Sequence, residues 1–264
     1  MTKELLWQQV VAVKERSPLV HSITNYVVMN FNANALLAAG ASPIMAHAAE
    51  EMDDMVNISG ALVVNIGTLD SNWVNSMKIA IKAAEAKNKP WVLDPVGAGA
   101  TAYRNQVIAE LLAIHRPAVI RGNASEILAV ANAENKTRGV DSTHSSNDAI
   151  EAAKQLSNQL KCVVCISGET DYITSNDMVT GLKNGHALMT RITGMGCTAS
   201  ALTGAFCAVQ ADAHLATCAA MAMMGVAGEV AVKKAGGPAT LQTAFLDALY
   251  TMDVTTFMET VHIV

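Results

Sequence analysis

Short apolar runs alternate with longer amphipathic segments through most of the chain, and this alternation restricts the fold more than any other feature. Residues 61–68 (ALVVNIGT) form an apolar run that ends in a glycine turn, as a buried strand does. In the segment that follows, residues 71–89, Trp73, Met77 and Ile81 recur at the spacing of one helix face. The same patterns predict a strand with its exit at 90–100, a helix at 103–115, a strand at 117–123, a helix at 124–132, a polar loop at 134–144, a helix capped near Ser146 at 146–160 and a strand at 162–167. We therefore expect an α/β fold with a mostly parallel central sheet and helices on both faces.

The last part of the chain departs from this rhythm. Residues 171–185 read as a β-meander, which we expect at an antiparallel edge of the sheet. After Cys197 the sequence is almost wholly helical: Asp212 is placed to cap a long helix, and the basic and glycine residues of 233–238 to end it. No shift in composition divides the chain, so we expect a single domain over residues 1–264.

The overall composition argues against several kinds of partner. The 264 residues are 51% hydrophobic, enough for one large core, and the net charge of −5 without a Lys/Arg cluster disfavours nucleic acid. Two stretches without charge, 22–46 and 192–211, are interrupted by asparagines, proline, glycines or threonines, so we expect no membrane span. The first eighteen residues carry charges where a signal peptide has an apolar core, which favours a cytoplasmic protein.

Only one of the five cysteines has an unusual setting. Cys162 and Cys165 form a C-x-x-C within a predicted strand, where residues three apart point to opposite faces, so we expect structural thiols rather than a redox or zinc pair. Cys207 and Cys218 lie in apolar helical stretches and read as core residues. Cys197, by contrast, follows a glycine-rich turn at the start of a predicted helix.

Polar residues and glycines collect where the predicted strands end. Ligands of parallel α/β sheets bind at the carboxyl ends of the strands, so we expect the functional site there. The segments concerned are 65–67, 94–99, 121–126 and 167–169, together with the turn Gly194, Met195 and Gly196. The first amides of a helix have no internal partner, so this turn and Cys197 could hold an anion such as a transferring phosphoryl group. A helix entry that is glycine-rich only for packing would look the same.

Three charged residues extend the same argument. Arg121 could bind nucleotide phosphates, while Asp94 and Glu126 could hold Mg²⁺ directly or through water. The simpler alternatives are that Asp94 bonds nearby amides and that Asn123 and Glu126 form a helix capping box. A cation, carboxylates and a helix N-terminus directed at one cleft suit phosphoryl transfer, which needs positioning and charge neutralisation more than covalent help. A Walker A motif and the loop motifs of protein kinases are absent from the sequence.

These motifs resemble those of the ribokinase-like small-molecule kinases, and in particular the hydroxyethylthiazole kinase family. The resemblance covers nearly the whole chain in order, and it rests on SPLVHSITNYVVMNFNANALLAAGASPIMA (17–46), NIGTL (65–69), DPVGAGAT (94–101), RGNASEI (121–127) and TGMGC (193–197). It implies a ribokinase-like fold and the ATP-dependent phosphorylation of 4-methyl-5-(2-hydroxyethyl)thiazole in thiamine salvage. It further implies Mg²⁺ as cofactor and a homotrimer with substrate sites near the subunit interfaces.

The resemblance also implies roles for individual positions. It places Met45, Asn25, Gly67 and Gly194 at the thiazole, Arg121 and Ser167 at ATP, Asp94 and Glu126 at the metal, and Gly194, Met195, Gly196 and Cys197 in the anion hole. Family members commonly have Ala or Thr at the position of Met195, and many have Thr at that of Ser167.

Cys197 stands where related kinases place a basic aspartate. The ordinary thiol pKa is about 8.5, and a helix N-terminus lowers it, although a bound γ-phosphate would oppose ionisation. Deprotonation of the alcohol can be late in a largely dissociative transition state, so we expect Cys197 to align the hydroxyl and to act only modestly as a base. The alternatives are a hydroxymethylpyrimidine or pyridoxal kinase, a transferase with Cys197 as covalent nucleophile and a histidine as its base, and a non-catalytic binding protein.

Overall fold

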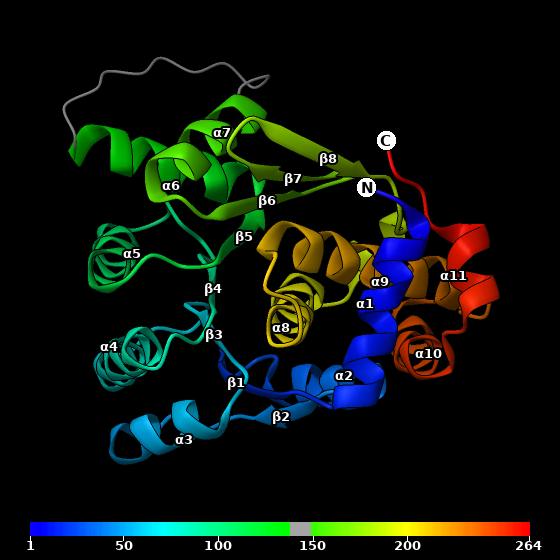
Figure 1. Cartoon of the computed structure of the whole chain (residues 1–264), viewed down its shortest axis with the longest axis horizontal. Coiled ribbons are helices and arrows are strands. Elements are labelled where there is room, and N and C mark those ends of the chain that lie inside the picture. Colours follow the sequence, from blue (N-terminus) through cyan, green and yellow to red (C-terminus); the bar gives the residue numbers. More distant parts are fainter. Residues whose placement is uncertain (138–148) are drawn as a thin grey trace.

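The computed structural model describes residues 1–137 and 149–264, and its strands form one mixed sheet (Figure 1). The strands are β1 (Leu19–Ile23), β2 (Ser42–Ile44), β3 (Ala61–Asn65), β4 (Trp91–Asp94), β5 (Val119–Asn123), β6 (Val163–Ser167), β7 (Asp171–Ser175) and β8 (Met178–Leu182). Within the described residues they lie in the order β2-β1-β3-β4-β5-β6-β7-β8. Pairing is parallel from β2 to β6 and antiparallel for β6–β7 and β7–β8, which confirms the predicted meander at the sheet edge.

Helices cover both faces of the sheet, as the alternating pattern predicts. They are α1 (Lys3–Arg16), α2 (Met29–Ala39), α3 (Met52–Ile58), α4 (Ser71–Ala86), α5 (Ala102–Ile114), α6 (Ala124–Thr137), α7 (Ala149–Leu160), α8 (Met195–Cys207), α9 (Ala213–Val232), α10 (Pro238–Thr251) and α11 (Val254–Thr260), with short 3₁₀ helices η1 (Ala49–Glu51) and η3 (Ala187–Arg191). Helices α3 to α7 lie on one face, and α1, α2, α8, α9, α10 and α11 on the other (Figure 1).

Two hydrophobic cores lie between the sheet and the helices, one on each face. One joins the inner side chains of α8, α9 and α10 to the sheet, and the other joins those of α4 to α7. Cys165 belongs to the first core and Cys162 to the second, which confirms that this C-x-x-C points to opposite faces. Both thiols are free, and burial raises the pKa of Cys162 to about 12.

The helix ends agree with most of the predicted signals. Asp212 caps α9 by accepting hydrogen bonds from the amides of His214 and Leu215, and α9 ends at Val232. Residues 134–137 of the predicted polar loop belong to α6 instead, because the helix continues to Thr137. The rest of that loop and the cap expected at Ser146 lie outside the described residues.

Helix α9 is long and apolar enough to cross a membrane by length and composition alone. Its apolar window is 78% buried within the fold, where it packs against α8, α10 and α1. Its hydrophobicity is therefore explained by core packing.

Candidate active site

The carboxyl ends of the parallel strands are held at one level by the sheet register. Asn65 at the end of β3 lies opposite Asp94 at the end of β4, and Asn123 lies opposite Ser167 at the ends of β5 and β6. The polar residues that follow the predicted strands are thus brought to a common edge, as expected.

Asn65 is the centre of a buried amide network at this edge. Its Oδ1 accepts hydrogen bonds of 2.9 Å from Asn25 Nδ2 and from the Gly67 amide. Its Nδ2 donates to Asp94 Oδ2 at 2.7 Å. Asn25, Asn65 and Asp94 are at most 4% exposed, so these bonds replace water at each group. The network joins the exits of β1, β3 and β4. The strand-end segment 65–67 pointed to this place, but no role was predicted for Asn65.

Arg104 fixes the loops that follow β3 and β4. Its Nη1 donates to the carbonyls of Ile66 at 2.5 Å and Val96 at 2.6 Å, and its Nη2 donates to Gly67 O at 2.8 Å. A guanidinium that clamps three carbonyls makes the edge rigid. Sequence reasoning missed Arg104, because it follows the α5 cap and belongs to none of the strand-end motifs.

The turn before α8 leaves a helix N-terminus free for a ligand. Gly194 has φ +87°, and a Cβ there would lie 2.3 Å from Val28 Cγ1, so this N-cap position requires glycine. The N-cap makes no side-chain bond, and the Thr198 amide bonds Gly194 O at 2.8 Å. The amides of Met195, Gly196 and Cys197 come before that bond and have no partner inside the helix. This geometry favours the anion-site reading of the turn over packing alone.

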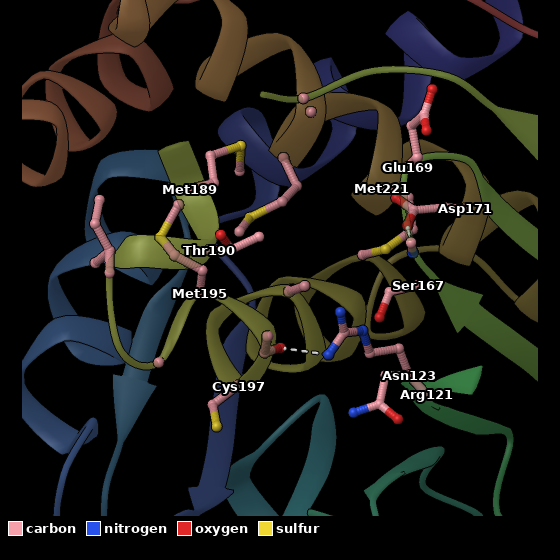
Figure 2. Close-up of a pocket in the computed structure, with 18 of the residues that line it drawn as sticks. Arg121, Asn123, Ser167, Glu169, Asp171, Met189, Thr190, Met195, Cys197 and Met221 are labelled. Carbon is pink, nitrogen blue, oxygen red and sulfur yellow. Dashed lines mark hydrogen bonds between the residues drawn. The ribbon is translucent and has the colours of Figure 1, made fainter. Parts of the chain in front are cut away.

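Arg121 brings a positive charge to the same place. The side chain is 8% exposed, and its Nη1 donates to Gly196 O at 2.9 Å, the bond drawn in Figure 2. A Cβ on Gly196 would lie 2.9 Å from Nη1, so glycine lets the guanidinium approach the helix. The Arg121 Nε has no hydrogen-bond partner among the described residues. A buried, unpaired guanidinium N–H beside a helix N-terminus is suited to a phosphate oxygen.

Glu126 forms the capping box that the sequence offered as the simpler reading. Its Oε2 accepts from the Asn123 amide, and its own amide donates to Asn123 Oδ1, both at 2.9 Å. Its Oε1 accepts from the Gly97 amide at 2.9 Å, which also ties it to the loop after β4. Both Glu126 and Asp94 nevertheless line the same cavity.

Asp94 and Glu126 can bind Mg²⁺ only together with ligands that the described part of the protein does not supply. Among the described residues, no group of three or more His, Cys, Asp or Glu side chains could hold a metal. Mg²⁺ is commonly bound by one or two carboxylates together with water and substrate phosphates. Asp94 and Glu126 fit an ion shared with a nucleotide, rather than a cage built by the protein alone.

Burial opposes ionisation of Asp94. Burial raises the pKa of this carboxyl to about 6, and the nearby Glu126 carboxylate adds to the increase. Arg121 and the hydrogen bonds from Ser200 and Asn65 act in the opposite direction. A second positive charge, such as a divalent cation, would lower the pKa again.

The Cys197 thiol does not have the lowered pKa expected at a helix N-terminus. Burial, followed by the Asp94 charge, raises its pKa to about 11, which outweighs the hydrogen bonds from Asn65 and Asn25. Asn25 Nδ2 lies 3.4 Å from the Cys197 sulfur. In the part of the chain that the structure describes, no hydrogen bond joins Cys197 to a histidine, which disfavours the covalent-nucleophile reading.

A cavity of about 730 Å³ collects most of the predicted site residues. Its lining includes Asp94, Arg121, Glu126, Ser167, Gly194, Met195, Gly196 and Cys197. Met45 is half-buried just after β2 and is not part of this lining. Asn25 and Gly67 are also outside it, but they reach it through Asn65 and Cys197. Of the residues expected at the thiazole, Gly194 therefore lines the cavity, whereas Met45, Asn25 and Gly67 lie outside it.

Asp171 joins the cavity from the start of β7. Its Oδ1 accepts from the Gly168 amide at 3.1 Å, and burial raises its pKa while Arg121 opposes the shift. It is thus both a turn carboxylate and a cavity residue. Lys183 lies at the surface, where its Nζ is 3.7 Å from Glu169 Oε1.

A family model connects this geometry to known proteins. The model of the hydroxyethylthiazole kinase family matches residues 10–255. The chain belongs to the hydroxyethylthiazole kinase family. It is 55% identical over 251 residues to a hydroxyethylthiazole kinase of Syntrophus aciditrophicus, covering 95% of this chain and 93% of the relative. It is 56% identical over 262 residues to that of Leptothrix cholodnii, covering 97% and 94%.

Solved structures agree with the family and with the fold. The hydroxyethylthiazole kinase of Pyrococcus horikoshii OT3 superposes with a TM-score of 0.92 at 39% identity, covering 99% of this chain and 98% of that one. A ribokinase-like protein of Enterococcus faecalis superposes with a TM-score of 0.65 at 12% identity, covering 94% of each chain, which shows a shared fold alone. The predicted ribokinase-like fold is confirmed.

Proposed function

We propose that the chain transfers the γ-phosphoryl group of ATP to the hydroxyl of 4-methyl-5-(2-hydroxyethyl)thiazole, giving the thiazole phosphate and ADP in thiamine salvage. One observation carries the proposal: the free N-terminus of α8, the Arg121 guanidinium and two carboxylates line the same cavity. Phosphoryl transfer needs these parts, because its catalysis is mainly positioning and neutralisation of charge. Membership of the hydroxyethylthiazole kinase family supports the thiazole alcohol as acceptor.

The anion hole at the start of α8 receives the transferring group in this proposal. The amides of Met195, Gly196 and Cys197 point to the γ-phosphoryl oxygens, where negative charge is present and shifts during transfer. Arg121 donates its free Nε–H to the ATP phosphates, and Ser167 contacts the nucleotide beside it. The Ser167 hydroxyl now bonds Gly122 O at 3.3 Å, a long bond that a phosphate oxygen could replace.

Asp94 and Glu126 hold Mg²⁺ together with the ATP phosphates in this proposal. The ion, when bound, supplies charge neutralisation at the phosphates. Glu126 contributes from a fixed position, because both of its oxygens already accept backbone amides. Asp94 is oriented by its bond from Asn65.

The alcohol approaches from the side of Cys197 that faces Asn25. With a thiol pKa of about 11, Cys197 is protonated at neutral pH and aligns the hydroxyl rather than taking its proton at the start. Asn25 and Gly67 border this acceptor side through the Asn65 network. Met45 packs on the thiazole ring, which suits a thioether.

The remaining features of the proposal concern the whole protein. The chain acts as a single kinase domain over residues 1–264, assembled as a homotrimer. The exposed Tyr26 and Val27, each 62% accessible beside Asn25, fit burial against a neighbouring subunit. A cytoplasmic location fits both the use of ATP and the five free thiols. Light scattering should give the mass of a trimer.

A panel of acceptor alcohols tests the assignment. The protein is incubated with ATP and Mg²⁺, and ADP is measured with the thiazole alcohol, hydroxymethylpyrimidine or pyridoxal. We expect the highest kcat/KM for the thiazole. A higher value for either of the other acceptors would replace the proposed substrate, and no release of ADP with any of them would support a non-catalytic binding protein instead.

A further inference from the structure

The far part of the cavity is lined by thioether and methyl groups. Beyond Arg121 and Ser167 the lining includes Met189, Met221, Met224 and Ile192, and Figure 2 shows Met189 and Met221 among the lining side chains. Met221, Met224 and Ile192 are at most 8% exposed, so this wall is dry. With the phosphates at α8 and Arg121, this remaining space is the place for the nucleobase.

The amide side chain at this end has no free N–H to donate to a base. Asn184 Nδ2 donates to Glu229 Oε1 at 2.8 Å and to Thr260 O at 2.9 Å. Its Oδ1 accepts from the His262 amide at 2.7 Å. Both hydrogens of the amide are thus in use, and its oxygen already has a short bond. Asn184 holds the wall together instead of facing a ligand.

The backbone of the neighbouring segment is similarly engaged. The Gly185 amide donates to Glu229 Oε1 at 3.1 Å. The Leu188 amide donates to His186 Nδ1 at 3.1 Å, and the Met189 amide to His186 O at 2.9 Å. The Thr190 hydroxyl donates to Ala187 O at 2.8 Å. The Gly185 amide is thus bonded to α9 and the other donors close turns within η3 and its entry, so these donors are not available to the edge of a purine.

We infer that this pocket binds the nucleobase by packing and does not read its hydrogen-bonding edge, so that purine nucleoside triphosphates in general serve as phosphoryl donors. The inference rests on the proposed function. Adenine and guanine differ in donors and acceptors at positions 1, 2 and 6 of the ring, and only directed polar groups distinguish these. A pocket of thioethers meets both rings with similar dispersion contacts.

Two exposed polar side chains lie at the open rim of the cavity, whereas the lining carboxylate of Asp171, whose pKa is raised by burial, lies near Arg121, whose charge opposes that shift. His186 keeps an Nε2–H, because its Nδ1 accepts from Leu188, and Glu169 is ion-paired with Lys183. His186 and Glu169 are both exposed, so water competes for any bond that they make to a base. His186 and Glu169 should therefore add little to discrimination between adenine and guanine.

The test compares donors at a fixed thiazole concentration. The ratio of kcat/KM for ATP to that for GTP should be below about 200, the most that apolar packing usually discriminates, whereas hydrogen-bonded readout reaches about 10⁴. A ratio above about 200 overturns the inference. Calorimetry with non-hydrolysable ATP and GTP analogues gives the same comparison without turnover. Comparable Kd values without thiazole phosphorylation would support a pocket that does not read the base and would refute the proposed function, and failure of both analogues to bind would refute both.

Variants of the cavity wall distinguish apolar packing of the nucleobase from recognition of its hydrogen-bonding edge. Met221→Ala should lower kcat/KM for ATP and GTP by the same factor, and Met221→Leu should restore most of it to both. His186→Ala should leave the ATP to GTP ratio within twofold of the wild type. A change of tenfold or more in that ratio for His186→Ala would mean that the base edge is read there, contrary to the inference. Circular dichroism of each variant shows whether it is folded.

Discussion

Asn65 donates a 2.7 Å hydrogen bond to Asp94 from the directly opposite position in the neighbouring parallel strand. The same Asn65 side chain accepts from Asn25, whose amide also reaches the Cys197 sulfur. One buried asparagine thus joins the carboxylate on the nucleotide side to the thiol on the acceptor side. We regard this connection as the structural basis for holding the two substrates in register.

Replacing Asn65 with Ala tests this connection. Asp94 would lose its short donor, and Asn25 would lose its acceptor, all in a buried setting. We expect the free energy of unfolding to fall by about 1–3 kcal/mol, as for other buried groups left without partners. The KM values for both ATP and thiazole should rise. Asn72→Ala, on the exposed surface of α4, is the matched control and should change neither the free energy of unfolding nor the KM values. An Asn65→Ala enzyme with normal stability and kinetics would refute the connection.

The role of Cys197 is tested by Cys197→Ala. A thiol with a pKa of about 11 is almost wholly protonated at pH 7, so little general-base catalysis is lost on its removal. A true general base contributes roughly 10²–10⁴-fold to the rate, so we expect kcat to fall by less than about 100-fold. Binding of ATP and thiazole, measured by calorimetry, should persist. If turnover disappeared while both ligands still bound, Cys197 would be more than an aligning group.

The raised pKa of Asp94 predicts how stability depends on pH. The folded protein binds the Asp94 proton more tightly than the unfolded chain, since the pKa rises from 3.8 to about 6. Ionised Asp94 therefore destabilises the fold: the effect is absent below pH 3.8, grows between 3.8 and 6, and is complete above 6. Urea unfolding of Asp94→Asn should show a gain of up to about 3 kcal/mol at pH 8, from about 1.4 kcal/mol per pKa unit. The gain should shrink towards pH 4, and a constant gain at all pH values would contradict the assignment.

The anion hole is tested at its glycine. In Gly194→Ala the Cβ would collide with Val28, and a positive φ would have to be kept by a residue that disfavours it. We expect a loss of about 1–3 kcal/mol of stability from backbone strain. We also expect kcat/KM to fall by at least about 100-fold, similar to the loss of one oxyanion-hole donor. Gly237→Ala, where a Cβ meets nothing within 4 Å, is the control and should retain kcat/KM. Equal activity in the two variants would argue against an anion site at Gly194.

The sequence predicted the parts of the site that follow from strand ends and missed those that depend on contacts across the fold. The period of apolar residues located β3 to β6, the break in that period located the meander, and the glycines located the α8 turn, because these are local patterns. Strands β1 and β2 were not predicted. The central position of Asn65 depends on the register between β3 and β4. The hydrogen bonds of Arg104 depend on two loops that meet beside α5. The helix terminus before Cys197, which is visible in the sequence, favours a lowered thiol pKa, but burial and the Asp94 charge, which are not visible there, raise it.

The most direct measurement of the central claim follows the γ-phosphoryl group itself. ATP with heavy oxygen isotope in the γ-phosphoryl group is incubated with Mg²⁺, the thiazole alcohol and the protein, and both products and intact protein are analysed by mass spectrometry. We predict that the label appears in thiazole phosphate in equal amount to the ADP formed, with the protein mass unchanged. Label in inorganic phosphate alone, or a phosphorylated protein, would contradict direct transfer in this cavity.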